Sequence, residues 1–232
     1  MLILFDIDGT LLLTQCAGMK AMHIAAQELF GSHVNFEGIE FAGRLDPLIW
    51  ADLARKHDID PAEHDRFRDA YARRLAQLFE EEPTSWLLPG VSTLVGDLRS
   101  RPEITLGLLT GNYPETGRLK IRTAGLDPAF FTVAAWGTDG PDRRDLPPVA
   151  MKHYAALHGR EIEAERVVVI GDTVHDVRCA KAHGCRSLAV GTGPTSDLSV
   201  LAAAGADLAV KDLSDTSAVL EWMLNLGAAV SE

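Results

Sequence analysis

The sequence has few residues of the kinds that stabilise a disulfide-rich or membrane-embedded fold. Its 232 residues include 3 cysteines, an odd number that does not suit a disulfide framework, and none forms a Cys-x-x-Cys pair. No apolar run approaches the roughly 20 residues of a transmembrane helix. Internal repeats and low-complexity segments are also absent. We therefore expect a globular protein with reduced, buried thiols.

Positive charge is scarce as well. The chain has 22 Lys and Arg against 33 Asp and Glu, a formal net charge of −11. Such a field opposes nucleic acids and anionic membranes, so we expect neither as a partner. The apolar N-terminal residues are interrupted by Asp6 and Asp8 and lack a basic leader, and a cytoplasmic location is therefore expected.

Short apolar runs alternate with helical patterns over most of the chain. After a first strand ending near Phe5, we expect strands at 104–110, 131–136, 166–172, 185–191 and 206–210. The predicted helices between them lie at 91–100, 114–124, 147–158, 174–183 and 196–204. Continuous apolar strands that alternate with helices are typical of a parallel sheet covered on both faces. The fold class is therefore α/β, with a doubly wound parallel sheet.

Residues 14–86 differ from the remainder, because they show long helical patterns and no convincing buried strand. We predict that they form an all-helical domain inserted after the first strand. Residues 1–13 and 87–232 then form the core domain, and "LLPG" at 87–90 leads the chain back to the sheet.

Two carboxylates follow the first strand, in "FDIDGT". Asp6 and Asp8 point to the same side of an extended chain, so they repel each other unless a cation, a proton or a substrate relieves the repulsion. An acidic turn closed by Gly9 is the simpler alternative at this point.

Other predicted strand ends also carry polar residues. "GLLTGN" supplies Thr110, Gly111 and Asn112, a hydroxyl and backbone N–H groups suited to a phosphate oxygen. "VVVIGDTVHD" supplies two further carboxylates, and "RRDLPP" supplies adjacent arginines before a helix. In open α/β sheets, functional residues gather where the strands end, beside the point at which strand order reverses.

These segments, "FDIDGT", "LLTGN", an arginine before "LPP" and "GDTVHD", resemble in order the four motifs of the haloacid dehalogenase superfamily. The helical segment resembles the cap of its phosphoglycolate-phosphatase-like branch. The third motif departs from the usual pattern of lysine followed by Pro-x-Pro. Arg143 aligns with it better, and Arg144 is the alternative.

The resemblance implies a Mg²⁺-dependent phosphatase that hydrolyses a small phosphorylated metabolite. Asp6 would be the nucleophile that forms an aspartyl phosphate, and Asp8 the general acid and base. The implied metal ligands are Asp6, the Asp8 carbonyl, Asp172 and Asp176. The implied phosphate cradle is Gly9, Thr110, Gly111 and Arg143.

The predicted cap contains two basic candidates for substrate recognition. "FAGRLDP" resembles the family's Gly-Arg segment, so Arg44 is expected to bind an anionic part of the substrate. The alternative is an ion pair with Asp46 or another acid of the cap. Lys20 is a weaker candidate for the same role.

Several rival functions share parts of this pattern. A phosphomutase would use every catalytic residue and retain the intermediate. A haloacid dehalogenase would not need Asp8, and a phosphonate-cleaving enzyme would need a reactive cap lysine, for which Lys20 and Lys56 are available. A phospho-acceptor signalling domain also has strand-end aspartates but no cap. The sequence names neither the ester nor the oligomeric state, for which we expect a monomer or a homodimer.

Overall fold

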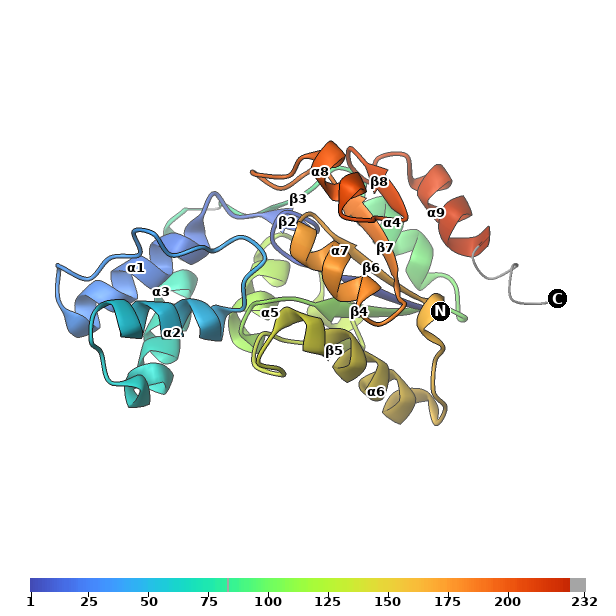
Figure 1. Cartoon of the computed structure of the whole chain (residues 1–232). Coiled ribbons are helices and arrows are strands. Elements are labelled where there is room, and N and C mark those ends of the chain that lie inside the picture. Colours follow the sequence, from blue (N-terminus) through green and yellow to red (C-terminus); the bar gives the residue numbers. More distant parts are fainter. Residues whose placement is uncertain (83, 226–232) are drawn as a thin grey trace.

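Six parallel strands form the centre of the computed structural model, which describes residues 1–82 and 84–225 (Figure 1). They are ordered β5-β4-β1-β6-β7-β8, and β1 lies between β4 and β6. Their bounds are β1 Leu2–Phe5, β4 Thr105–Leu109, β5 Val133–Ala135, β6 Val167–Gly171, β7 Arg186–Val190 and β8 Leu208–Val210. The strand order reverses at β1, so the segment that carries Asp6 lies at the topological switch point. The predicted parallel sheet is confirmed.

Helices cover both faces of this sheet. On one face lie α4 (Val91–Arg99), α5 (Pro114–Thr123) and α9 (Thr216–Asn225), packed against the β1 side chains of Ile3 and Phe5. On the other face lie α6 (Leu146–His158), α7 (Val174–Lys181) and α8 (Leu198–Ala203); α6 and α7 pack against Leu2 and Leu4. Alternate residues of β1 are thus buried on opposite faces, as a fully covered parallel strand requires. The sequence reading did not include α9.

Three helices between β1 and α4 have an apolar core of their own. These are α1 (Ala17–Phe30), α2 (Asp46–Lys56) and α3 (His64–Glu81), which we call the helical insert. The Trp50 ring stacks on that of Phe67 with centroids 4.7 Å apart, inside this second core. Among the described residues, no helix is long and apolar enough to cross a membrane.

A short antiparallel pair connects the insert to the sheet. It consists of β2 (Leu12–Leu13) and β3 (Trp86–Leu87), with Leu13 opposite Trp86. The first residue of β3, Trp86, falls at the end of the predicted helical segment, but it is 41% exposed and so is not the buried strand that the sequence excluded there. The boundaries of the two predicted domains remain a prediction.

Candidate active site

Three carboxylates converge where β1 and β6 end. Asp6 follows β1, Asp172 follows β6, and Asp176 lies in the first turn of α7; all are buried. One oxygen from each lies within 4.8 Å of the others. Parallel pairing of β1 with β6 aligns Phe5 with Ile170, which brings the two strand ends together. The arrangement concentrates negative charge in a poorly solvated place.

Arg143 enters this acidic group. Its guanidinium Nη2 lies 3.0 Å from Asp6 Oδ2, also pairs with Asp176, and its side chain is only 6% exposed. Arg144 instead pairs with Asp142 on the surface. Of the two arginines of the third motif, Arg143 is thus the one beside the strand-end carboxylates. Its planar donor group holds two of them at once.

Burial changes the protonation of these groups. Loss of solvent raises the Asp6 pKa to about 6, although Arg143 opposes the change. The Asp172 pKa rises to about 8, because of burial and then repulsion from Asp176 and Asp6. Arg143 is desolvated too, but the attraction of Asp176 and Asp6 raises its pKa further above its ordinary value. A cation among the carboxylates would relieve the repulsion.

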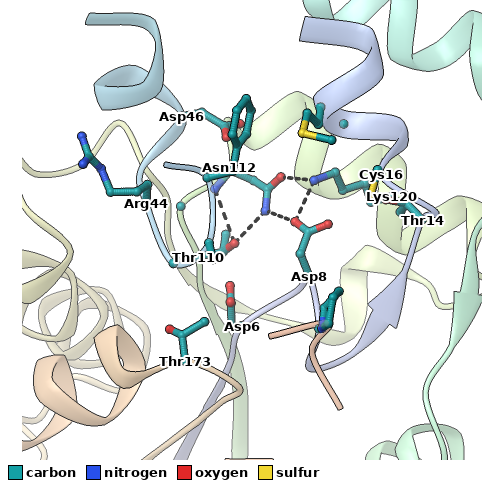
Figure 2. A pocket seen from close by; sticks show the side chains of 18 of the residues that line it. Asp6, Asp8, Thr14, Cys16, Arg44, Asp46, Thr110, Asn112, Lys120 and Thr173 are labelled. Carbon is teal, nitrogen blue, oxygen red and sulfur yellow. Dashed lines mark hydrogen bonds and ion pairs between the residues drawn. The ribbon is translucent and has the colours of Figure 1, made fainter. Parts of the chain in front are cut away.

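Asp8 belongs to a separate hydrogen-bonded network (Figure 2). Lys120 Nζ donates to Asp8 Oδ2 at 2.7 Å and to Asn112 Oδ1 at 2.6 Å. The Asn112 amide donates to the same Asp8 oxygen at 2.8 Å and to the Thr110 hydroxyl at 2.9 Å. The Asp8 side chain nevertheless remains 43% exposed, whereas that of Lys120 is 6% exposed. The network therefore fixes Asp8 while leaving it open to the cavity.

The sequence reading missed Lys120. This lysine lies on the buried face of α5, beside Thr116, Gly117 and Ile121. A lysine within the core-facing stripe of an amphipathic helix was the available signal, because such a side chain is rarely buried without a partner. For Asn112 the sequence pattern predicts a backbone N–H at a strand end, whereas the structure places its side-chain amide at the centre of this network.

Two glycines near the site permit close approaches. Gly9 has φ +80°, and a Cβ there would lie 2.5 Å from Asp172 Oδ2. Any other residue at this position would be strained and would fill the space beside that carboxylate. Gly111 accepts a hydrogen bond from the Asp46 backbone at 2.8 Å, and a Cβ on it would collide with the Arg44 carbonyl. Gly111 thus brings the insert against the sheet.

A cavity of about 420 Å³ opens between the sheet and the insert. On the sheet side it is lined by Asp6, Asp8, Gly9, Thr110, Gly111, Asn112, Lys120, Arg143 and Asp172. The implied catalytic and phosphate-binding residues all line this cavity, and so does Asp172, whereas Asp176, Arg144, Lys20 and Lys56 do not. Asp46 also lines it, and burial raises the Asp46 pKa to about 7.

Arg44 contributes to the cavity lining, but its guanidinium points away from the polar network (Figure 2). Its Nη2 lies 2.7 Å from Asp52 Oδ2, and Arg55 binds the other oxygen of Asp52 at 2.8 Å. The acid that pairs with Arg44 is therefore Asp52 of α2 and not Asp46, whose carboxylate accepts the Tyr113 backbone N–H at 3.1 Å. Lys20 lines a different hollow, beside α3.

A family model described as haloacid dehalogenase-like hydrolase matches residues 1–184. The chain belongs to this family. It is 28% identical over 203 residues to a phosphoglycolate phosphatase of Synechococcus elongatus, covering 87% of this chain and 88% of that protein. It is also 28% identical over 202 residues to the tyrosine-protein kinase PtkA of Mycobacterium tuberculosis, covering 83% of this chain and 62% of that protein. The predicted likeness to the phosphoglycolate-phosphatase-like branch is confirmed.

Solved structures support the fold. CbbY from Rhodobacter sphaeroides, crystallised in complex with phosphate, superposes with a TM-score of 0.71 at 21% identity, covering 92% of this chain and 95% of that chain. At this level of identity the likeness concerns the fold alone. This haloacid dehalogenase-like chain thus places its strand-end residues at the switch point of a fold common to both proteins.

The acidic group fits a hard divalent cation. Asp6 and Asp172 each line the cavity, and carboxylate oxygens are the ligands that such ions prefer. Asp176 is more fully engaged: it accepts hydrogen bonds from the Thr173 N–H at 3.0 Å and hydroxyl at 2.6 Å, and it pairs with Arg143. This difference favours Asp6 and Asp172 as direct ligands and Asp176 as a residue that orients Arg143.

Proposed function

We propose that this protein is a Mg²⁺-dependent phosphatase that hydrolyses a small phosphate monoester through an aspartyl phosphate on Asp6. The observation that carries the proposal is the convergence of Asp6, Asp8, Thr110 and Arg143 on one cavity at the switch point. The family to which the chain belongs and its phosphoglycolate phosphatase relatives support the same reaction class.

In the first step, an oxygen of Asp6 attacks phosphorus, and the bond from phosphorus to the ester oxygen breaks. Arg143 holds Asp6 at 3.0 Å and offers remaining guanidinium hydrogens to the transferred group. The Thr110 hydroxyl, fixed by Asn112, supplies a further donor. These groups stabilise the charge that develops on the phosphoryl oxygens.

Asp8 handles the proton in both steps. It protonates the departing ester oxygen, and then takes a proton from the water that attacks the aspartyl phosphate. Lys120 and Asn112 hold one oxygen of Asp8, which leaves the other free to face the reacting group. A carboxylate held in this way loses little conformational freedom on reaching the transition state.

We propose Mg²⁺ as the cofactor, held by Asp6, Asp172 and the Asp8 carbonyl, with Asp176 nearby. When bound, the ion neutralises phosphate charge and orients the phosphoryl group. The acidic group supports this assignment, because its carboxylates otherwise repel one another at short range.

The substrate and the setting are also proposals. We propose a small phosphorylated metabolite as the substrate, and neither nucleic acid nor a membrane as a partner, which the net charge of −11 favours. A cytoplasmic monomer or homodimer, with residues 14–86 acting as a cap over the cavity, completes the proposal.

Phosphate release tests the reaction directly. The purified chain is assayed with Mg²⁺ against sugar, nucleotide and small-acid monophosphates, with Asp6→Asn as the matched control. We expect release from at least one class of ester by the natural protein and none by the variant. Equal release by both proteins, or isomerisation without release, would contradict the proposal, the second result in favour of a phosphomutase.

A second candidate is phosphoryl transfer to a protein tyrosine, which the likeness to a protein named as a tyrosine kinase supports. Both reactions start with nucleophilic displacement at phosphorus and differ in the acceptor. Incubation with radiolabelled ATP and a tyrosine-containing polypeptide distinguishes them. Labelled polypeptide would favour the kinase, and labelled free phosphate the hydrolase.

A further inference from the structure

The side of the cavity that faces the polar network is largely apolar. It consists of six side chains, which we call the apolar wall: Leu13, Met19, Met22, Phe41, Ile49 and Trp86. Met19 and Met22 lie three residues apart on α1 and so share one helix face. Leu13 and Trp86 are opposite each other in the β2–β3 pair. Separate elements thus present apolar surface to the same space.

Two members of the apolar wall are exposed although they are large. The described residues include four such side chains, namely Met19, Trp86, Leu157 and Val200, which are 45%, 41%, 53% and 51% exposed. Met19 and Trp86 both border the cavity, whereas Leu157 and Val200 do not. Exposed apolar side chains that gather at a cavity indicate contact with a ligand. Thioether and indole groups suit an apolar body of variable shape.

The cations that line the cavity are already paired. Among the described lining residues these are Arg44, Lys120 and Arg143. Arg44 binds Asp52 at 2.7 Å, Lys120 binds Asp8 at 2.7 Å, and Arg143 binds Asp6 at 3.0 Å. The last two lie beside the site of phosphoryl transfer. A second anion, placed against the apolar wall, would find no unpaired cation there.

Asp46 also disfavours a second anion in the cavity. It is 7% exposed, lines the cavity, and receives the Tyr113 N–H. When ionised it repels a second anion, whereas it accepts a hydrogen bond from a neutral donor such as a hydroxyl or an amide. An anion that moved from water to the apolar wall would lose its hydration and gain no cation in exchange.

We propose that the cavity selects phosphate monoesters whose leaving group is uncharged and carries an apolar body that rests on the apolar wall. The inference rests on the proposed phosphatase function and narrows its substrate class. It predicts that esters with a second anionic group, phosphoglycolate among them, are poor substrates. A cavity of about 420 Å³ has room for a leaving group of aryl size.

A matched pair of esters tests the charge preference. 4-Carbamoylphenyl phosphate and 4-carboxyphenyl phosphate have the same shape and similar leaving groups, but only the second bears a carboxylate. We expect kcat/KM to be at least about tenfold higher for the amide, because the carboxylate loses hydration in the cavity without a cation to replace it. Equal values, or a preference for the carboxylate, would overturn the inference.

Variants of Met19 and Trp86, the two exposed members of the apolar wall, test whether the leaving group contacts the wall. Trp86→Ala and Met19→Ala should each lower kcat/KM for the carbamoyl ester by roughly three- to tenfold, because apolar contact area is lost. Met19→Lys should raise the relative activity toward the carboxylate ester. Leu157→Ala and Val200→Ala remove equally exposed side chains elsewhere and should leave both esters unaffected. If the two pairs of alanine variants behave alike, the wall does not bind the leaving group.

Acetyl phosphate separates this inference from the proposed function. Its leaving group offers little apolar surface to the wall, so its hydrolysis depends on the chemistry at Asp6 far more than on that contact. Its hydrolysis should be unchanged in the Trp86 and Met19 variants and lost in Asp6→Asn. Hydrolysis that does not depend on Asp6 would count against the proposed function. Asp6-dependent hydrolysis together with a carboxylate preference would count against the substrate class only.

Discussion

The sheet side of the cavity holds acidic and basic side chains against one another, whereas the insert side turns its basic side chain, Arg44, away from them. Asp6 is paired with Arg143, and Asp8 with Lys120, at the ends of rigid, buried strands. Arg44, the basic residue of the insert that lines the cavity, is paired with Asp52 of α2, eight residues later. Polar groups on a rigid sheet are preorganised for charge that develops during a reaction. Apolar surface on the insert distinguishes substrates by shape and by charge.

The largest expected effect comes from substituting the two aspartates of "FDIDGT". These variants separate the role of Asp6 from that of Asp8 on the sheet side of the cavity. Asp6→Asn should lower turnover by on the order of 10⁴-fold and prevent any phosphoenzyme, because the attacking carboxylate is gone. Asp8→Asn should still undergo the first step with p-nitrophenyl phosphate, whose leaving group needs little protonation, and then stall.

Intact-mass spectrometry distinguishes the two variants. The Asp8 variant should release a burst of p-nitrophenol and gain about 80 Da, the mass of one PO₃H group, on Asp6. The Asp6 variant should show neither. Labelling of the Asp6 variant, or normal turnover by the Asp8 variant, would mean that the two roles are assigned wrongly.

The next largest effect concerns Lys120. Lys120→Met keeps the aliphatic stem but removes the donor that fixes Asp8 and Asn112. We expect about a 10²-fold loss of kcat with a poor alkyl leaving group, because Asp8 is no longer held in place. With p-nitrophenyl phosphate the first step should be nearly unaffected, as a positioning role requires. Lys152→Met, an exposed residue of α6, is the control. An equal loss with both substrates would indicate a general structural role instead.

The sequence predicted the sheet and the position of the strand-end residues because both follow from local patterns. Apolar runs of four to five residues identify β1 and β6, and parallel pairing then brings Asp6 and Asp172 together. The bond from Lys120 to Asp8 joins residues 112 positions apart, and no local pattern encodes it. The partner of Arg44 depends on how α2 presents Asp52, eight residues later. Contacts between side chains from different elements, in the core and in the insert alike, were therefore the least predictable part of the site.

Stability should also depend on the sheet side, because three buried carboxylates repel one another there. The folded-state pKa of Asp172 is about 8, against an ordinary value of 3.8. Between these values the folded protein keeps a proton that the unfolded chain has lost, so stability falls as the pH rises through this interval. Mg²⁺ competes with that proton, and its stabilising effect should grow from pH 5 to pH 8.

Calorimetry measures this effect without any assay of activity. At a Mg²⁺ concentration about 100 times its Kd, the Tm at pH 8 should rise by roughly 5–10 °C. Asp172→Asn should be more stable than the natural protein at pH 8 without metal and should lose most of the Mg²⁺ response. If Mg²⁺ raises the Tm of both proteins equally, the ion binds elsewhere.

The smallest expected effect comes from Arg44, and it addresses the comparison most directly. The ion pair with Asp52 is partly exposed, with side chains 27% and 23% accessible, so Arg44→Ala should cost only about 0.2–1 kcal/mol of stability. We expect less than about a threefold change in kcat/KM for either phenyl ester, because the guanidinium points away from the polar network and is paired with Asp52. Asp52→Ala is the complementary change: it frees Arg44 to turn inward and should improve the carboxylate ester severalfold while leaving the carbamoyl ester unchanged. If Arg44→Ala alone abolishes the hydrolysis of the carboxylate ester, Arg44 binds the carboxylate of that ester in the natural protein. The insert side would then recognise its substrate by charge, as the sheet side does.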